Sequence, residues 1–255
     1  MIPADLRDGE LVLEGRIIQA SNATFLGRIG TVKVVYKPVA GERPLWDFPG
    51  STLARREVAA YLVSESFGWD LVPRTWLRDG PFGPGMVQVW QQPDPAQQAV
   101  DLVPTDDVPA EGWCHVFDGL DAQDRPVSLI HEDSPVLRRM AVFDVVVNNA
   151  DRKGGHVLEM TDGHRYGVDH GLTFHSDNKL RTVLWGWLGH DLHAEELAGL
   201  ERLQGALDTD LGDPLGELIS GSEIAALVGR CDHLLRHARF PAPAGEMPTI
   251  PWPPF

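Results

Sequence analysis

Two short polar clusters near the middle of the chain hold the residue types that chemistry on a phosphate needs. Residues 151–156 read DRKGGH and follow an apolar stretch from Met140 to Val147, and residues 168–171 read VDHG. Asp151 and Asp169 stand 18 positions apart, which leaves room for a loop, a strand, a tight turn and a second strand between them. One carboxylate would then accept a proton, and the other would hold a divalent cation on a phosphate.

The first cluster has the setting of a catalytic loop. An aspartate just past a buried helix is held rigidly enough to take a proton from a hydroxyl, so Asp151 is the candidate base. A solvated loop is the alternative for residues 151–153. The helix before it is apolar on nearly every face, which favours a loop that reaches a functional surface.

In the second cluster, Asp169 precedes Gly171 and follows a strand-like segment. A carboxylate in that place can coordinate a cation that bridges nucleotide phosphates, although turns also use Asp and Gly freely. A metal-hydrolase site built from histidines and aspartates is a further alternative, but their spacing matches no ligand pattern. Its members would be His156, His164, His170, His175, Asp169 and Asp177.

A second pair of charged residues lies in the N-terminal third. The β-branched run from Thr31 to Tyr36 delivers Lys37 at the end of a strand, and Glu57 lies within a helix expected over 53–67. A strand lysine faces phosphate oxygens well if a helix glutamate fixes its ammonium group. The alternative is an exposed lysine and a solvated glutamate.

Two further segments could contact a nucleotide. Ser21 and Asn22 begin a small polar turn that could cover phosphates through backbone N–H groups, although it lacks the usual glycines. Val87, Val89 and Trp90 lie in a strand that could border an adenine ring, with core packing as the equal alternative.

The elements that must position these residues follow from the hydrophobic pattern. The first ninety residues predict an antiparallel sheet with one inserted helix, and a helix should run from Ser134 to about Asn149. Residues 157–168 predict a hairpin, residues 94–132 receive no assignment, and later helices are expected near 193–207, 214–219 and 223–239. The predicted organisation is an N-terminal lobe over 1–93, a C-terminal lobe over 94–240 and a proline-rich extended tail over 241–255.

Composition excludes several classes of protein. The chain has 255 residues, 43% of them hydrophobic, and a formal net charge of −15. That charge disfavours nucleic acid and anionic membranes as partners, and no apolar run is long enough to span a bilayer. Cys114 and Cys231 form no CxxC pair, and the acidic N-terminus resembles no signal peptide, so we expect a cytoplasmic location.

Together, Lys37, Glu57 and the two clusters resemble the atypical kinases related to phosphatidylinositol 3/4-kinases. The likeness covers roughly residues 10–190 and is best over 143–153. The chain also resembles a small actinobacterial group usually placed with those kinases and, more distantly, the toxin-type serine kinases of bacteria.

The resemblance implies an α+β, bilobal protein-kinase-like fold with ATP in the cleft. Lys37 would contact the α- and β-phosphates and Glu57 would orient it. Asp151 would be the catalytic base, with Arg152 beside it, and Asp169 the principal magnesium ligand. The connection over 86–90 would receive adenine.

Two residues depart from the family pattern. Lys153 replaces a histidine, and its charge could still lie beside the transferred phosphoryl group. His156 replaces an asparagine that binds the metal, and imidazole suits Mn²⁺ better than Mg²⁺. Either ion could therefore be the cofactor.

The expected activity is ATP-dependent transfer of the γ-phosphate to a hydroxyl. The acceptor would be a protein, this chain's own Ser or Thr included, or a soluble small molecule, because the segment 172–181 is short and only mildly basic. The alternatives are a nucleotide-binding pseudokinase with a regulatory or scaffold role, a phosphoinositide kinase and a metal-dependent phosphohydrolase.

Overall fold

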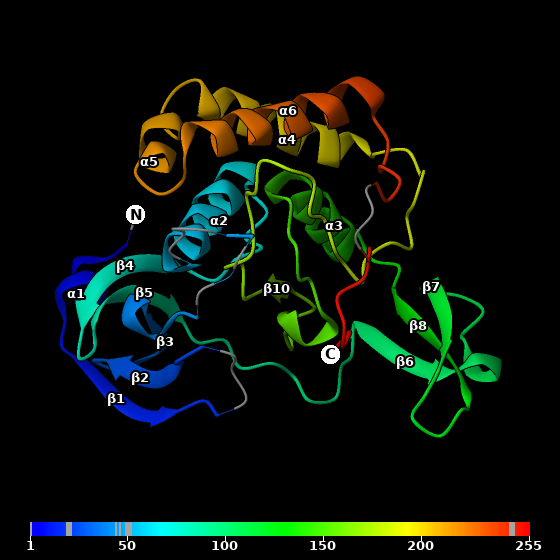
Figure 1. Ribbon diagram of the computed structural model, residues 1–255, viewed down its shortest axis with the longest axis horizontal. Coiled ribbons are helices and arrows are strands. Elements are labelled where there is room, and N and C mark those ends of the chain that lie inside the picture. Colours follow the sequence, from blue (N-terminus) through cyan, green and yellow to red (C-terminus); the bar gives the residue numbers. More distant parts are fainter. Residues whose placement is uncertain (1, 19–21, 44, 46, 49–52, 245–247) are drawn as a thin grey trace.

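The computed structural model describes residues 2–18, 22–43, 45, 47–48, 53–244 and 248–255. It contains a β-rich N-terminal part and a mainly helical C-terminal part (Figure 1), which confirms the expected α+β class. Among these residues, no helix combines the length and apolarity that crossing a membrane requires.

The N-terminal part is a five-stranded antiparallel sheet with the order β1-β2-β3-β5-β4. A helix, α2, is inserted between β3 and β4, and a short helix, α1, precedes the sheet. The predicted sheet with one inserted helix is thus confirmed. The bounds are α1 (Ala4–Asp8), β1 (Leu11–Arg16), β2 (Phe25–Ile29), β3 (Val32–Pro38), α2 (Leu53–Phe67), β4 (Thr75–Gly80) and β5 (Gly83–Val89).

The pairing of β3 with β5 decides which side chains face the inserted helix. Tyr36 lies opposite Val87, and Lys37 lies opposite Met86. Successive residues of a strand point to opposite faces. Met86 packs against Ala54 of α2, whereas Tyr36 and Val87 lie in a separate core cluster. Lys37 therefore shares the face of the sheet that α2 covers.

Residues 94–132 form a second, three-stranded antiparallel sheet, which extends to the right in Figure 1. Its strands are β6 (Val100–Pro104), β7 (Trp113–Leu120) and β8 (Pro126–Glu132), in the order β6-β8-β7. No residue of β7 is buried, and its register shifts between His115 and Phe117. A strand without a buried face lacks the alternation of buried and exposed residues that identifies a strand in a sequence, so the pattern of β7 does not predict it.

The C-terminal part is built around α3 (Pro135–Val147). The Ser134 hydroxyl accepts a hydrogen bond from the Leu137 N–H at 3.2 Å and caps this helix, and Asn148, with φ of 54°, ends it. The hairpin β9 (Val157–Glu159) and β10 (Arg165–Gly167) follows, and α4, α5 and α6 cross the top of Figure 1. Their bounds are Ala194–Leu207, Gly212–Gly216 and Gly221–His237, close to the predicted ranges.

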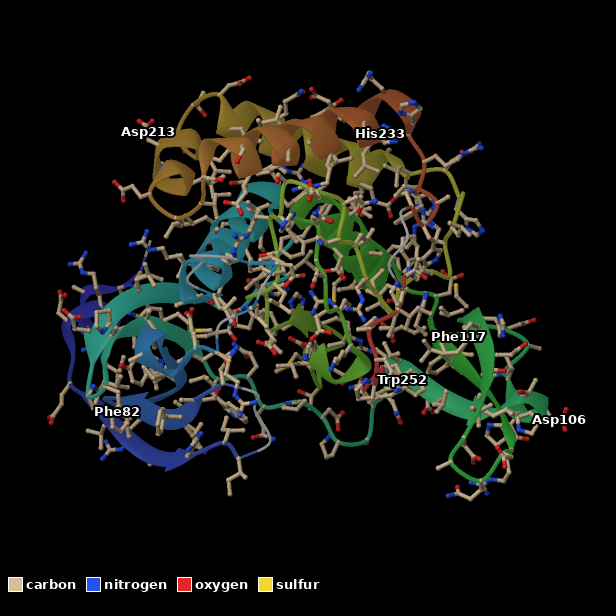
Figure 2. All side chains as sticks on the ribbon, viewed as in Figure 1. Phe82, Asp106, Phe117, Asp213, His233 and Trp252 are labelled. Atoms are coloured by element: carbon tan, nitrogen blue, oxygen red, sulfur yellow. The ribbon has the colours of Figure 1, made fainter. Side chains whose placement is uncertain are left out.

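One large hydrophobic core joins these helices to α2. It contains Phe67 of α2, Phe143 of α3 and Leu200 of α4. Figure 2 shows how densely side chains fill the space between the helices. Because α2 packs against both Met86 of the sheet and this core, it fixes the position of the sheet relative to the helical part.

A buried histidine ties the second sheet to the C-terminal part. His131 of β8 accepts a hydrogen bond from the Gly186 N–H at 3.0 Å through Nε2, so Nδ1 carries the proton and donates to the Glu132 carbonyl at 2.9 Å. Burial lowers the pKa of His131, which keeps the ring neutral. This histidine makes the stability of the fold depend on pH.

We predict that acid destabilises the protein through His131. Below about pH 6.5 the unfolded chain takes up a proton that the folded ring does not, so the free energy of unfolding falls as pH falls, by at most about 1.4 kcal/mol per pH unit for one proton. Denaturant unfolding between pH 8 and pH 5 should show a smaller fall in His131→Gln. Parallel losses in the two proteins would contradict this.

Candidate active site

Lys37 lies between two carboxylates that come from distant parts of the chain. Its Nζ atom is 2.6 Å from Glu57 Oε1 and 2.7 Å from Asp169 Oδ1. The Glu57 side chain is 2% exposed and that of Lys37 is 22% exposed. The alternative of a solvated glutamate is therefore wrong. The strand β3, the helix α2 and the loop after β10 each supply one member of this cluster.

The charges in this cluster stabilise one another. Burial opposes the charge on Lys37, but the carboxylates of Asp169 and Glu57 outweigh that effect and raise the pKa of the lysine. The ammonium group in turn lowers the pKa of Asp169. Burial raises the pKa of Glu57, whose second oxygen accepts a hydrogen bond from the His170 N–H at 3.0 Å. Lys37 is thus a fixed cation at neutral pH.

Arg152 is a buried support for the site. Its guanidinium group is 0% exposed and forms a two-point ion pair with Asp144 of α3, with Nε–Oδ2 and Nη2–Oδ1 distances of 2.9 Å. Nη1 donates to the carbonyls of His156 and Val168 at 3.1 and 3.3 Å, and Nη2 lies 2.6 Å from His170 Nε2. Each of the five N–H donors of the guanidinium therefore has a partner.

The expectation that Arg152 acts directly in catalysis is corrected by this placement. A side chain closed off from solvent, with every donor used, cannot contact a substrate. Arg152 is a positioning residue, because it follows Asp151 in the chain and binds Val168 and His170, the two neighbours of Asp169.

Sequence reasoning missed two residues of this support. Asp144 is fully buried, and Asn149 links it to the loop by donating to Asp144 Oδ1 at 2.9 Å and accepting from the Asp151 N–H at 3.0 Å. The available signal was a single acidic residue in the apolar run from Met140 to Val147, since a buried charge requires a partner.

Asp151 lies at the surface of this support. Burial raises the pKa of its carboxyl group, and Lys153 Nζ lies 3.9 Å from Asp151 Oδ2. The side chains are 27% and 21% exposed, so both are accessible from solvent. A carboxylate with a raised pKa is a stronger proton acceptor.

The ring of His156 faces Asp169. Its Nδ1 atom lies 2.9 Å from the Asp151 carbonyl, which can only accept, so Nδ1 carries the proton. Burial lowers the pKa of His156, and in the neutral ring the lone pair of Nε2 then faces Asp169 Oδ2 at 3.5 Å. Both atoms have lone pairs to offer a divalent cation, and the Lys37 ammonium already lies 2.7 Å from the other oxygen of Asp169. His156 and Asp169 therefore fit as ligands of a divalent cation.

The histidines of the alternative hydrolase site do not meet. His164 Nε2 lies 2.8 Å from the Asp70 carbonyl, His170 is fully buried against Arg152, and His175 packs on Phe48. Within the described part of the chain, no group of three or more His, Cys, Asp or Glu residues could hold a metal. A cation between His156 and Asp169 would need further ligands from a bound molecule or water.

A cavity of about 290 Å³ opens beside this cluster. It brings together five of the residues predicted from the sequence: Asn22, Lys37, Glu57, Asp151 and Asp169. Asn22 belongs to the predicted turn over the phosphates, and its Oδ1 accepts a hydrogen bond from the Arg43 N–H at 2.9 Å. Ser21 lies outside the described residues.

The predicted adenine contacts of β5 need correction. Val87 is fully buried in the core cluster around Tyr36, and Val89 packs against that same cluster, on the face of the sheet opposite Lys37. Neither side chain lines the cavity. Trp90 is half-buried and does not line the cavity either. Its backbone N–H donates to the Lys33 carbonyl at 3.0 Å.

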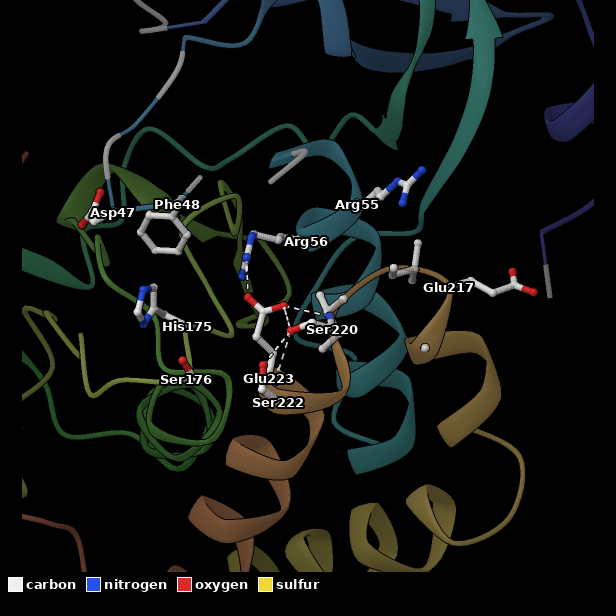
Figure 3. Close-up of a pocket in the computed structure, with 13 residues that line it drawn as sticks. Asp47, Phe48, Arg55, Arg56, His175, Ser176, Glu217, Ser220, Ser222 and Glu223 are labelled. Atoms are coloured by element: carbon white, nitrogen blue, oxygen red, sulfur yellow. Dashed lines mark hydrogen bonds and ion pairs between the residues drawn. The ribbon is translucent and has the colours of Figure 1, made fainter. Parts of the chain in front are cut away.

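A second cavity, of about 530 Å³, lies near the N-terminus of α6 (Figure 3). There Arg56 of α2 forms an ion pair with Glu223 of α6 and donates to the Thr173 carbonyl. The Thr173 hydroxyl donates to the His170 carbonyl at 2.7 Å. Arg56 thus fixes α2 to the turn that carries Asp169, so its neighbour Glu57 is held where it can reach Lys37.

The Asp144–Arg152 pair should dominate the stability of the site. We predict that Asp144→Ala lowers the free energy of unfolding by about 3–5 kcal/mol, because it leaves a buried guanidinium without its counter-charge. The double variant Asp144→Leu/Arg152→Met should recover part of this loss. The matched control is Asp191→Ala in an exposed ion pair with Arg239, for which about 0–1 kcal/mol is expected. Equal losses in denaturant unfolding of the two single variants would contradict the prediction.

Comparison with known proteins gives a relative that matches nearly the whole chain. No family model matches, so the likeness to the phosphatidylinositol 3/4-kinase group stays a prediction. The crystal structure of a Helicobacter pylori proinflammatory kinase, CtkA, aligns with a TM-score of 0.47 and 14% identity over 92% of this chain and 94% of that chain, which lends no support to an activity here. Protein Rv2133c of Mycobacterium tuberculosis is 50% identical over 265 residues, which cover 99% of this chain and 95% of the relative. The chain belongs to the family of Protein Rv2133c.

Proposed function

We propose that this protein is an ATP-dependent phosphotransferase that transfers the γ-phosphate of ATP to a hydroxyl group. The observation that carries the proposal is Lys37, held by Glu57 and Asp169 at the edge of a cavity that Asp151 also lines. In this proposal residues 1–93 form the nucleotide-binding lobe and residues 94–240 the catalytic lobe.

In this proposal Lys37 and Asn22 bind the phosphates, and Glu57 positions Lys37. An ammonium group has three donors, and Lys37 uses two of them on Glu57 and Asp169. The third has no partner among the residues that the structure describes and can bind a phosphate oxygen, and Asn22 lines the same cavity. Glu57 is almost fully buried, so it keeps Lys37 in place when Asp169 binds a metal ion instead of the lysine.

Asp151 is the proposed base. The acceptor oxygen attacks the γ-phosphorus, the bond from that phosphorus to the β–γ bridging oxygen breaks, and ADP leaves. The hydroxyl proton passes to the Asp151 carboxylate, whose raised pKa favours this transfer. Lys153, at 3.9 Å from Asp151, places a positive charge beside the transferred phosphoryl group.

Asp169 and His156 are the proposed metal ligands. A bound divalent cation would neutralise charge on the β- and γ-phosphate oxygens. The neutral imidazole of His156 favours Mn²⁺ over Mg²⁺ relative to an all-oxygen site. The acceptor is proposed to be a protein or a soluble small molecule, because a net charge of −15 disfavours docking on anionic lipid.

A nucleotide-binding pseudokinase is the second candidate, and one distance favours it. If nucleotide binding left His156 protonated, its Nε2 would form an ion pair with Asp169 across 3.5 Å and take the place of the cation. Such a protein would bind ATP without turnover.

ADP release with Mg²⁺ or Mn²⁺ tests the proposal. We expect turnover by the wild type, a loss of about 10²–10⁴-fold in kcat for Asp151→Asn because the base is removed, and weakened ATP binding for Lys37→Met. Lys33→Met, an exposed lysine of the same strand, is the control. Binding without turnover would favour the pseudokinase, and phosphate-ester hydrolysis that does not need Lys37 would favour a hydrolase.

The identity of residue 156 should set the metal preference. We predict that His156→Asn raises the ratio of Mg²⁺-supported to Mn²⁺-supported turnover by at least about tenfold, or about 1.4 kcal/mol, because an oxygen ligand replaces a nitrogen ligand. His164→Asn, outside the site, is the matched control. An unchanged ratio would mean that His156 does not bind the metal.

A further inference from the structure

The C-terminal segment lies against the loop that carries Asp151. The Gly154 N–H donates to the Pro254 carbonyl at 2.8 Å. The Thr249 carbonyl accepts from the Thr182 N–H at 3.1 Å and from Trp185 Nε1 at 2.9 Å. Figure 1 shows the C-terminal end beside the short turn that follows Lys153.

The ring of Phe255 packs directly on Gly154. A Cβ atom built at Gly154 would lie 2.3 Å from Cε1 of that ring, so glycine is what allows this contact. Gly154 immediately follows Lys153 in the loop 151–156. We call the Pro254 carbonyl, the Thr249 carbonyl and the Phe255 ring the tail contacts.

Burial shows that this segment is seated on the protein. Pro251 and Pro254 are buried, and Ile250 packs against the main core. Trp252 is the most exposed large side chain of the segment, at 75%, and lies at the junction with the second sheet (Figure 2). Phe255 is 45% exposed, so the ring covers Gly154 with one side and meets solvent with the other. Residues 248–255 of the predicted tail, which spans 241–255, therefore lie against the body of the protein.

The tail contacts and Arg152 act on the same short loop. Thr182 forms a parallel bridge with Arg152 and donates to Thr249, so it lies between the loop and the tail. Arg152 holds the loop before Lys153, and the tail holds Gly154 after it. Lys153 is therefore fixed from both sides.

We propose that the tail contacts position the loop 151–156 for phosphoryl transfer, an inference that rests on the proposed function. Displacing a reacting group by about 1 Å can cost about 10²-fold in rate. Lys37, Glu57 and Asp169 are held by contacts that do not involve the tail. Loss of the tail contacts therefore lowers kcat and leaves the KM for ATP unchanged.

The test compares Phe255→Ala, Phe255→Tyr and Trp252→Ala in the full chain. We expect kcat to fall about 10- to 100-fold in Phe255→Ala at constant KM for ATP, and to be kept in Phe255→Tyr and Trp252→Ala. Gly154→Ala should lower kcat similarly, because its methyl group displaces the ring. The double variant Gly154→Ala/Phe255→Ala should be no worse than either single one. Wild-type kcat in both single variants would overturn the inference.

Hydrogen exchange separates this inference from the proposed function. The amide of Gly154 bonds to the tail, and that of His156 bonds within the loop, to the Lys153 carbonyl at 3.1 Å. Phe255→Ala should speed exchange at both. Faster exchange at Gly154 alone, or at neither, would overturn the inference even if the wild type is active. A wild type without turnover would refute the proposed function, and exchange at His156 would still decide whether the tail holds the loop.

Discussion

The site depends on one buried ion pair, between Arg152 and Asp144. A charge in the protein interior is tolerated only when its hydrogen-bonding capacity is met, and a planar guanidinium group meets it in fixed directions. Arg152 follows Asp151 and binds both neighbours of Asp169, Val168 and His170. A single side chain therefore sets the relative position of the two carboxylates.

The helix α2 is the second constraint, because it carries the charge network across the molecule. Arg56 binds Glu223 of α6, and the next residue, Glu57, binds Lys37 of the sheet. The same helix packs on Met86 with one face and reaches the main core with another. A shift of α2 would move Glu57 away from Lys37, so packing and electrostatics in this protein are coupled.

The protein as a whole is strongly acidic, but positive and negative groups lie next to one another in the site. Lys37 and Lys153 each lie beside an aspartate, and the field of Lys37 keeps Asp169 ionised. His156 adds a neutral nitrogen that faces Asp169. Net charge therefore says little about the site, because neighbouring groups within a few ångströms decide which of its members are charged.

The sequence by itself determined the elements whose signals are local: the strands around Lys37, the helix of Glu57, and the capped apolar helix before Asp151. It also supplied four of the charged residues that line the cavity, namely Lys37, Glu57, Asp151 and Asp169. Only the tertiary structure decided that Val87 faces away from Lys37, that Arg152 is buried, that β6 to β8 form a sheet and that Phe255 lies on Gly154. Those outcomes depend on strand register and on contacts between distant segments, which the local pattern of residues does not encode.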